Sequence, residues 1–129
     1  MNNFLTKFLV MKNPIFKYDD RLIKFAVDII CFCKTLPNDM VGKYYYDQIL
    51  RSSGSSALNY GEAQGTNTNK DFIYKMTLVI KELRETKIAL KILDQGNIGN
   101  QAMIKHLSRE LEELISIAVR MVLNKKGRM

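Results

Sequence analysis

The stretch from Gln48 to Leu93 constrains the fold of this chain more than any other part of the sequence. It reads QILRSSGSSALNYGEAQGTNTNKDFIYKMTLVIKELRETKIALKIL, so small and polar residues lead through a glycine-marked corner into a long amphipathic segment. Gly54 costs a helix about 1 kcal/mol relative to alanine. A helix tolerates that cost where another backbone approaches closely, which predicts close helix packing around residues 52–57. The other interpretation of this run of small residues is a break in the helix, with a loop from Ser52 to Ser56.

Apolar residues spaced three and four apart indicate amphipathic helices along most of the chain. Pro37 ends the first helix because it lacks a backbone donor and clashes with the preceding turn. Thr68 and Asp71 fit a capping box at the start of the third helix, and Gly96 fits the left-handed position after its end. Short connections between the helices predict an all-α fold, an antiparallel up-down-up-down four-helix bundle. Its helices are expected at about 20–36, 40–64, 69–95 and 100–124.

The chain has 129 residues, a length typical of one domain. Its net charge of +7 lies at its two ends. Residues 1–17 carry three bases and no acid, residues 120–129 carry four bases and no acid, and residues 18–119 carry 13 of each. Chain ends are usually mobile. We therefore expect a flexible basic segment over 1–17, the helical bundle over 18–124 and a basic tail over 125–129.

The two cysteines and the absence of targeting features indicate the cytoplasm. Cys31 and Cys33 stand two residues apart on a predicted helix, face away from each other and cannot form a disulfide with one another. Two free thiols fit a reducing compartment. The start, MNNFLTKFLVMKN, carries Lys7 and lacks a small-residue cleavage site, so we expect no signal peptide. No apolar run approaches the roughly 20 residues of a membrane span, so no membrane partner is expected.

Polar residues recur on one face of the second predicted helix and flank the core face of the third. Their spacing predicts a structural network that fixes the helix register. A catalytic interpretation would pair Glu62 with Glu85 as acid and base, but no metal-ligand set, oxyanion loop or neighbouring histidine accompanies them. We therefore expect no catalytic residue, metal or cofactor, and no enzyme. The network residues are Arg51, Ser55, Asn59, Glu62, Glu82 and Glu85.

Basic residues cluster on one side of the third predicted helix and near the end of the fourth. Such cations either bind nucleic acid phosphates or form an ordinary solvated surface. The candidate nucleic-acid-binding residues are Lys81, Arg84, Lys87, Lys91, Arg120, Lys125, Lys126 and Arg128.

Several short motifs together resemble the bacterial four helix bundle protein family. They are QILRS, then S-x-x-x-N-x-x-E-A from Ser55 to Ala63, then KDFIYKM and KELRET. The family includes proteins encoded by intervening sequences of large-subunit ribosomal RNA genes, and the chain is also similar to the accessory variability determinant of diversity-generating retroelements. The resemblance implies a bundle that assembles into a ring, a homopentamer, without known enzymatic activity. For the retroelement relatives it implies binding to a reverse transcriptase and to nucleic acid.

Two functions remain open from the sequence. The first is a non-enzymatic oligomeric adaptor that binds RNA or DNA weakly through its basic residues. The second is a pure protein-interaction scaffold, because four isoleucines of the third helix lie off its core stripe and require a partner surface. These are Ile73, Ile80, Ile88 and Ile92.

Overall fold

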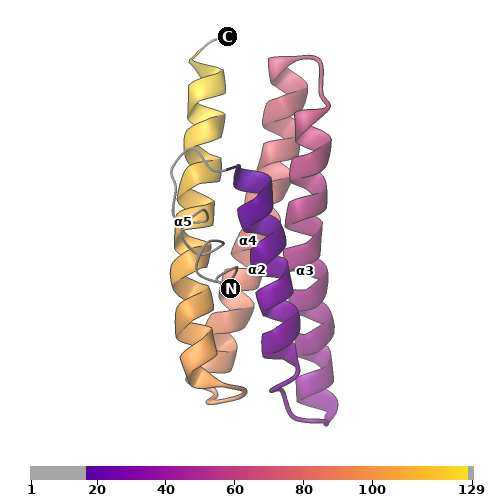
Figure 1. Cartoon of the computed structure of the whole chain (residues 1–129), viewed down its shortest axis with the longest axis vertical. Helices are drawn as coiled ribbons and strands as arrows, with labels where there is room; N and C mark the ends of the chain where they lie inside the picture. Colours follow the sequence, from indigo (N-terminus) through magenta and orange to yellow (C-terminus); the bar gives the residue numbers. More distant parts are fainter. Residues whose placement is uncertain (1–16, 128–129) are drawn as a thin grey trace, which may run out of the picture.

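The computed structural model describes residues 17–127 as four helices, shown in Figure 1. Each helix runs opposite to the one before it, and α2 packs against both α3 and α5, so the helices close into an up-down-up-down bundle. The all-α architecture predicted from the periodicity is confirmed. The helices are α2 (Tyr18–Cys33), α3 (Met40–Gln64), α4 (Asn69–Gln95) and α5 (Gln101–Lys126).

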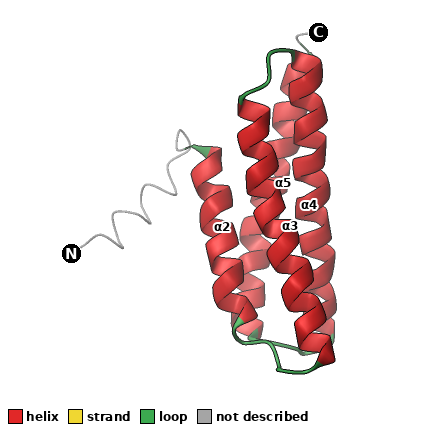
Figure 2. Ribbon diagram, turned by 90° about the vertical axis from the view of Figure 1, so that its right-hand side faces the viewer, coloured by secondary structure: helices red, strands yellow, loops and turns green. Residues whose placement is uncertain are grey.

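The helix ends differ from the predicted ones by a few residues. Helix α2 begins two residues early and ends at Cys33, three residues before the predicted end, because the chain tightens into a turn ahead of Pro37. Helix α5 continues through Lys126, so the first two residues of the predicted tail are helical. The small-residue run is continuous helix within α3, and the alternative loop from Ser52 to Ser56 is therefore wrong. In Figure 2 the loops lie at the ends of the bundle.

The end of α4 departs from the prediction for Gly96. Its φ is −80°, in the right-handed region, and its N–H donates to the carbonyl oxygen of Ile92. Positive φ values occur instead at Asn97 (56°) and Gly99 (84°). The left-handed conformation thus begins one residue later than predicted, at Asn97. Position 99 needs a glycine, because its φ is positive and a Cβ there would lie 3.0 Å from the Phe32 ring.

Side-chain caps begin three of the four helices. Asp39 accepts from the N–H of Gly42 at the start of α3, and Asn100 accepts from Met103 at the start of α5. The predicted Thr68 cap is present, since its hydroxyl accepts from the Asp71 N–H at 3.1 Å. Each cap satisfies a backbone donor that has no partner inside the helix, a contribution of about 1 kcal/mol.

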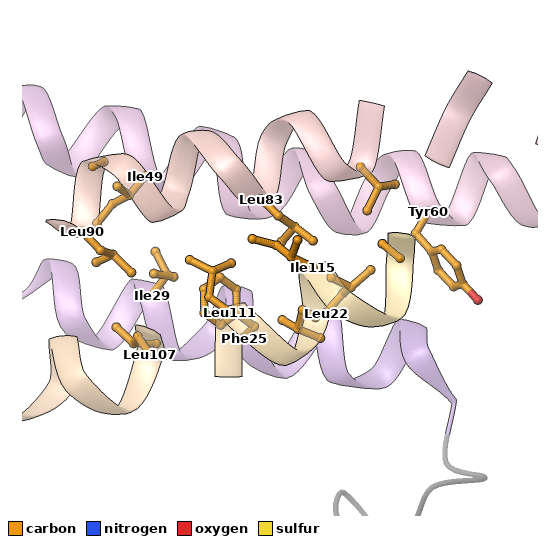
Figure 3. Packing of buried hydrophobic residues seen from close by; sticks show 14 of the residues in the cluster. Leu22, Phe25, Ile29, Ile49, Tyr60, Leu83, Leu90, Leu107, Leu111 and Ile115 are labelled. Atoms are coloured by element: carbon orange, nitrogen blue, oxygen red, sulfur yellow. The ribbon is translucent and has the colours of Figure 1, made fainter. Parts of the chain in front are cut away.

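The hydrophobic core runs along the bundle axis, where apolar side chains from all four helices meet (Figure 3). Each large apolar side chain buried there contributes about 1.5–3 kcal/mol. Residues that are fully or almost fully buried include Leu22, Phe25, Ile29, Ile49, Leu83, Leu90, Leu107 and Leu111. The predicted basic segment 1–17, apart from Lys17, lies outside the described residues, as does Arg128.

Candidate functional site

A cluster of basic side chains lies where α4 and α5 run side by side. The Lys87 ammonium of α4 pairs with the Glu112 carboxylate of α5 at 2.9 Å, so both residues face the junction of the two helices. At about 100° per residue, Lys91 lies on the same side of α4 as Lys87, and Lys105 and Arg109 lie on the same side of α5 as Glu112. Four cations thus share one surface.

The antiparallel register brings these cations to a similar height along the bundle. Lys91 comes four residues after Lys87 in α4. Because α5 runs in the opposite direction, Lys91 lies opposite a point about four residues before Glu112, between Lys105 and Arg109. All three of these cations are exposed, and none takes part in an ion pair within residues 17–127. We call Lys87, Lys91, Lys105 and Arg109 the basic face.

Lys105 and Arg109 of the basic face are not among the candidates that the sequence indicates. They stand seven and three residues before Glu112, which is helical spacing on one side of α5. That spacing is visible in the sequence. The sequence does not show which side of the fourth helix meets the third, and the Lys87–Glu112 ion pair identifies that side.

The other basic candidates are distributed over several surfaces. Lys81 and Arg84 border a groove on the outer side of α4. Lys125 lies over the Phe72 ring, 5.0 Å from its centroid, in cation–π geometry. Arg120 and Lys126 are exposed on α5. Arg84 stands three residues before Lys87, on the same side of α4, so it adjoins the basic face as well as the groove. The structure therefore brings only some of the predicted cations together on one face.

The groove on α4 has an apolar floor and a basic border. Its volume is about 830 Å³, and it extends from Tyr44 and Tyr45 of α3 across α4 to Val119 of α5. Ile88 and Ile92, two of the isoleucines expected to need a partner, line it and are 56% and 45% exposed. Ile80 lines it as well, whereas Ile73 packs partly buried against the core. The full lining is Tyr44, Tyr45, Gln48, Thr77, Ile80, Lys81, Arg84, Glu85, Ile88, Ala89, Ile92 and Val119.

The polar residues of α3 and α4 form a connected network at the surface between these helices. Arg51 bridges Glu82 and Glu85, with its Nη1 atom 3.1 Å from the Glu82 carboxylate. The Ser55 hydroxyl donates to Glu82 at 3.4 Å, and the Asn59 amide donates to the Ser55 carbonyl at 2.9 Å. Five of the six predicted network residues are therefore joined, and Arg51 is half exposed, so the network orients two helices rather than enclosing a cavity.

Glu62 lies outside this network. Its carboxylate pairs with Lys75 of α4, whereas Glu85 pairs with Arg51, so the two glutamates of the catalytic interpretation are held by different cations. Within residues 17–127 no group of three or more His, Cys, Asp or Glu side chains could hold a metal ion. None of the described helices is long and apolar enough to span a membrane.

The fold and its surfaces define a small four-helix bundle with a basic face, an apolar groove and a structural polar network. The chain matches the model of the 23S rRNA-intervening sequence protein family over residues 18–120, and it belongs to that family. It is similar to a crystal structure of a protein of unknown function from the S23 ribosomal protein family of Bacteroides thetaiotaomicron, with 26% identity and a TM-score of 0.76. The similarity covers 82% of this chain and 98% of that protein. No curated protein matches the sequence.

Proposed function

We propose that this protein is a non-enzymatic helical-bundle adaptor that binds the phosphate backbone of nucleic acid weakly through its basic face. The observation that carries the proposal is the convergence of Lys91, Lys105 and Arg109 on one exposed surface without ion-pair partners in residues 17–127. Exposed cations with no internal partner are free to replace the counterions that surround a phosphate chain. The free thiols of Cys31 and Cys33 suit a reducing compartment, and the cytoplasm is part of the proposal.

The size of the basic face sets the strength and the kind of binding. Three or four phosphate contacts supply modest, sequence-independent affinity that falls steeply with salt. Contacts to phosphates orient a protein on the nucleic acid but do not read bases. We therefore expect binding to structured RNA and to duplex DNA of similar length, without strong sequence preference.

A second candidate function is a protein-interaction scaffold, and the groove on α4 favours it. Ile88 and Ile92 are exposed side by side with Tyr44, which is 60% exposed, and a continuous apolar surface of this kind commonly marks a protein contact. The two functions are compatible because the groove and the basic face differ in residues.

Paired charge-neutralising variants test the binding proposal. The variant K91Q/K105Q removes two cations of the basic face. The variant K34Q/K43Q removes two exposed cations that lie after α2 and in α3, outside the basic face, with the same change in net charge. In gel shifts of a 20-base-pair RNA duplex, we expect K91Q/K105Q to weaken binding about tenfold at low salt. The slope of log K against log salt should fall by about 2, roughly 1 for each lost phosphate contact.

The control should bind almost as wild type does, because its cations lie off the basic face. Equal weakening of both variants would mean that net charge alone drives binding and would overturn the assignment of the face. The absence of a retarded band for the wild-type protein at low salt would reject the function itself.

A further inference from the structure

An acidic side chain lies within the basic face and is paired there with one of its cations. The Glu112 carboxylate of α5 is 2.9 Å from the Lys87 ammonium of α4, and within residues 17–127 it has no other ion-pair partner. Arg109 stands three residues before Glu112 on the same side of α5, so a second cation adjoins the pair. The next residue, Glu113, is instead held by Arg21 of α2, on another side of the helix. Glu112 is therefore the acid of α5 that bears on the basic face.

The Lys87–Glu112 ion pair is accessible to solvent and can be exchanged. The side chain of Lys87 is 31% exposed and that of Glu112 is 60% exposed. Ion pairs at such positions add little to stability, because water solvates both groups well once they separate. A phosphate oxygen that approaches Lys87 can therefore replace the carboxylate, which turns into the solvent.

We propose that Glu112 competes with nucleic acid for Lys87 and thereby keeps the affinity of the basic face low. In the free protein the carboxylate neutralises Lys87, and in the complex a phosphate takes its place. Binding then includes the free energy of separating the ion pair, and it leaves a carboxylate close to a phosphate chain of the same charge. This inference rests on the proposed function, because it concerns the regulation of the same surface.

Asp94 provides a matched comparison on the same surface. It stands seven residues after Lys87 in α4, which places it on the same side of the helix, and it is exposed. Its carboxylate takes part in no ion pair within residues 17–127. Neutralising Asp94 thus changes the charge near the basic face by the same amount as neutralising Glu112, but it releases no cation. A difference between the two variants measures the release of Lys87.

Gel shifts of the full chain with the same RNA duplex at low salt test the proposal. We expect Glu112→Gln to tighten binding about fivefold and Asp94→Asn to tighten it less than about twofold, because only the first change frees a cation from an exposed ion pair. Helical circular dichroism of each variant shows that the bundle is still folded. A Glu112→Gln variant that binds no more tightly than Asp94→Asn would overturn the inference.

The Lys87→Gln background shows whether Glu112 acts through Lys87. Adding Glu112→Gln to Lys87→Gln should tighten binding no more than Asp94→Asn does in the wild-type protein, because no cation remains to be released. An equal gain in both backgrounds would mean that Glu112 acts only as a local negative charge, and the competition would be wrong.

The outcomes for the inference and for the proposed function differ. Weaker binding by K91Q/K105Q together with unchanged binding by Glu112→Gln would leave the function in place and reject the competition. If neither the wild-type protein nor Glu112→Gln gave a retarded band at low salt, the function itself would be rejected, and this inference with it.

Discussion

The hydroxyl groups of Ser52 and Thr86 lie 2.6 Å apart in the bundle core, and neither side chain is exposed to solvent. They join α3 to α4 at a point where most neighbouring side chains are apolar. The Thr86 hydroxyl also donates to the Glu82 carbonyl at 3.0 Å, so both groups are satisfied within the protein. A buried polar pair of this kind fixes the register of two helices, because a shift along either axis would leave both hydroxyls without a partner.

We expect Thr86→Val to lower the free energy of unfolding by about 1–2 kcal/mol. Valine keeps the shape of threonine but leaves the buried Ser52 hydroxyl with only its 3.5 Å contact to the Ile49 carbonyl. Urea denaturation of wild type and variant at the same protein concentration measures the effect, because stability depends on concentration for any protein that self-associates.

The double variant S52A/T86V tests whether the hydroxyl pair is responsible. Replacing both partners by apolar groups leaves no unsatisfied hydroxyl, so the double variant should lose at least 0.5 kcal/mol less than the sum of the single variants, on the usual scale for coupled contacts. Additive losses would mean that the two side chains contribute independently, through packing alone.

Two glycines of α3 should respond to alanine in opposite ways. At Gly42 a Cβ would lie 1.8 Å from the carbonyl oxygen of Pro37, so Gly42→Ala should force the turn before α3 apart and cost about 3 kcal/mol. At Gly54 a Cβ would meet nothing within 4 Å, so Gly54→Ala should raise the free energy of unfolding by about 0.5–1 kcal/mol. Thermal and urea denaturation of the two variants measure both effects, and a loss at Gly54 would show that its surroundings are tighter.

The small-residue run shows how far the sequence predicts packing. The prediction of close packing holds for Ser52, Ser53 and Ser56, which are almost completely buried. It does not hold for Gly54, whose missing side chain opens onto free space. Small residues suit both a crowded contact and an open surface, so their spacing alone could not separate the two. The helices themselves were predictable because the three- and four-residue spacing of apolar side chains has no common alternative over such lengths.

The candidate site was predictable only in part, for a different reason. Periodicity assigns each residue to a side of its own helix, which placed Arg51 and Glu82 correctly for a network between α3 and α4. The basic face depends on the relative rotation and register of α4 and α5, which periodicity within one helix does not contain. Spacing within α4 therefore groups Lys87 with Lys81 and Arg84 but does not show that Lys87 pairs with Glu112 across the helix junction.

Thiol reactivity should differ sharply between the two cysteines. Cys31 is exposed, whereas Cys33 is 1% exposed and its burial raises the pKa of its thiol to about 12. A thiol-specific reagent at pH 8 should therefore label one cysteine per native chain, and both after unfolding, because the thiolate is the reactive form. Cys31→Ser should abolish the rapid labelling and Cys33→Ser should leave it unchanged. Rapid labelling of Cys33 would show that this end of α2 opens readily.

The same buried thiol makes the stability of the protein sensitive to alkaline pH. The pKa of Cys33 is about 12 in the folded protein and about 8.5 in an unfolded chain, so the unfolded state loses its proton first as the pH rises. The contribution of the neutral thiol is fully present below about pH 8.5 and is lost progressively as the pH rises toward 12. In that window wild type should lose up to about 1.4 kcal/mol per pH unit more than Cys33→Ala, which lacks the titrating group. Urea denaturation of both proteins at pH 7, 9 and 10 gives the comparison, and lysine and tyrosine titrations cancel in the difference. Parallel stability curves for the two proteins would show that Cys33 ionises as easily in the folded bundle as in the unfolded chain.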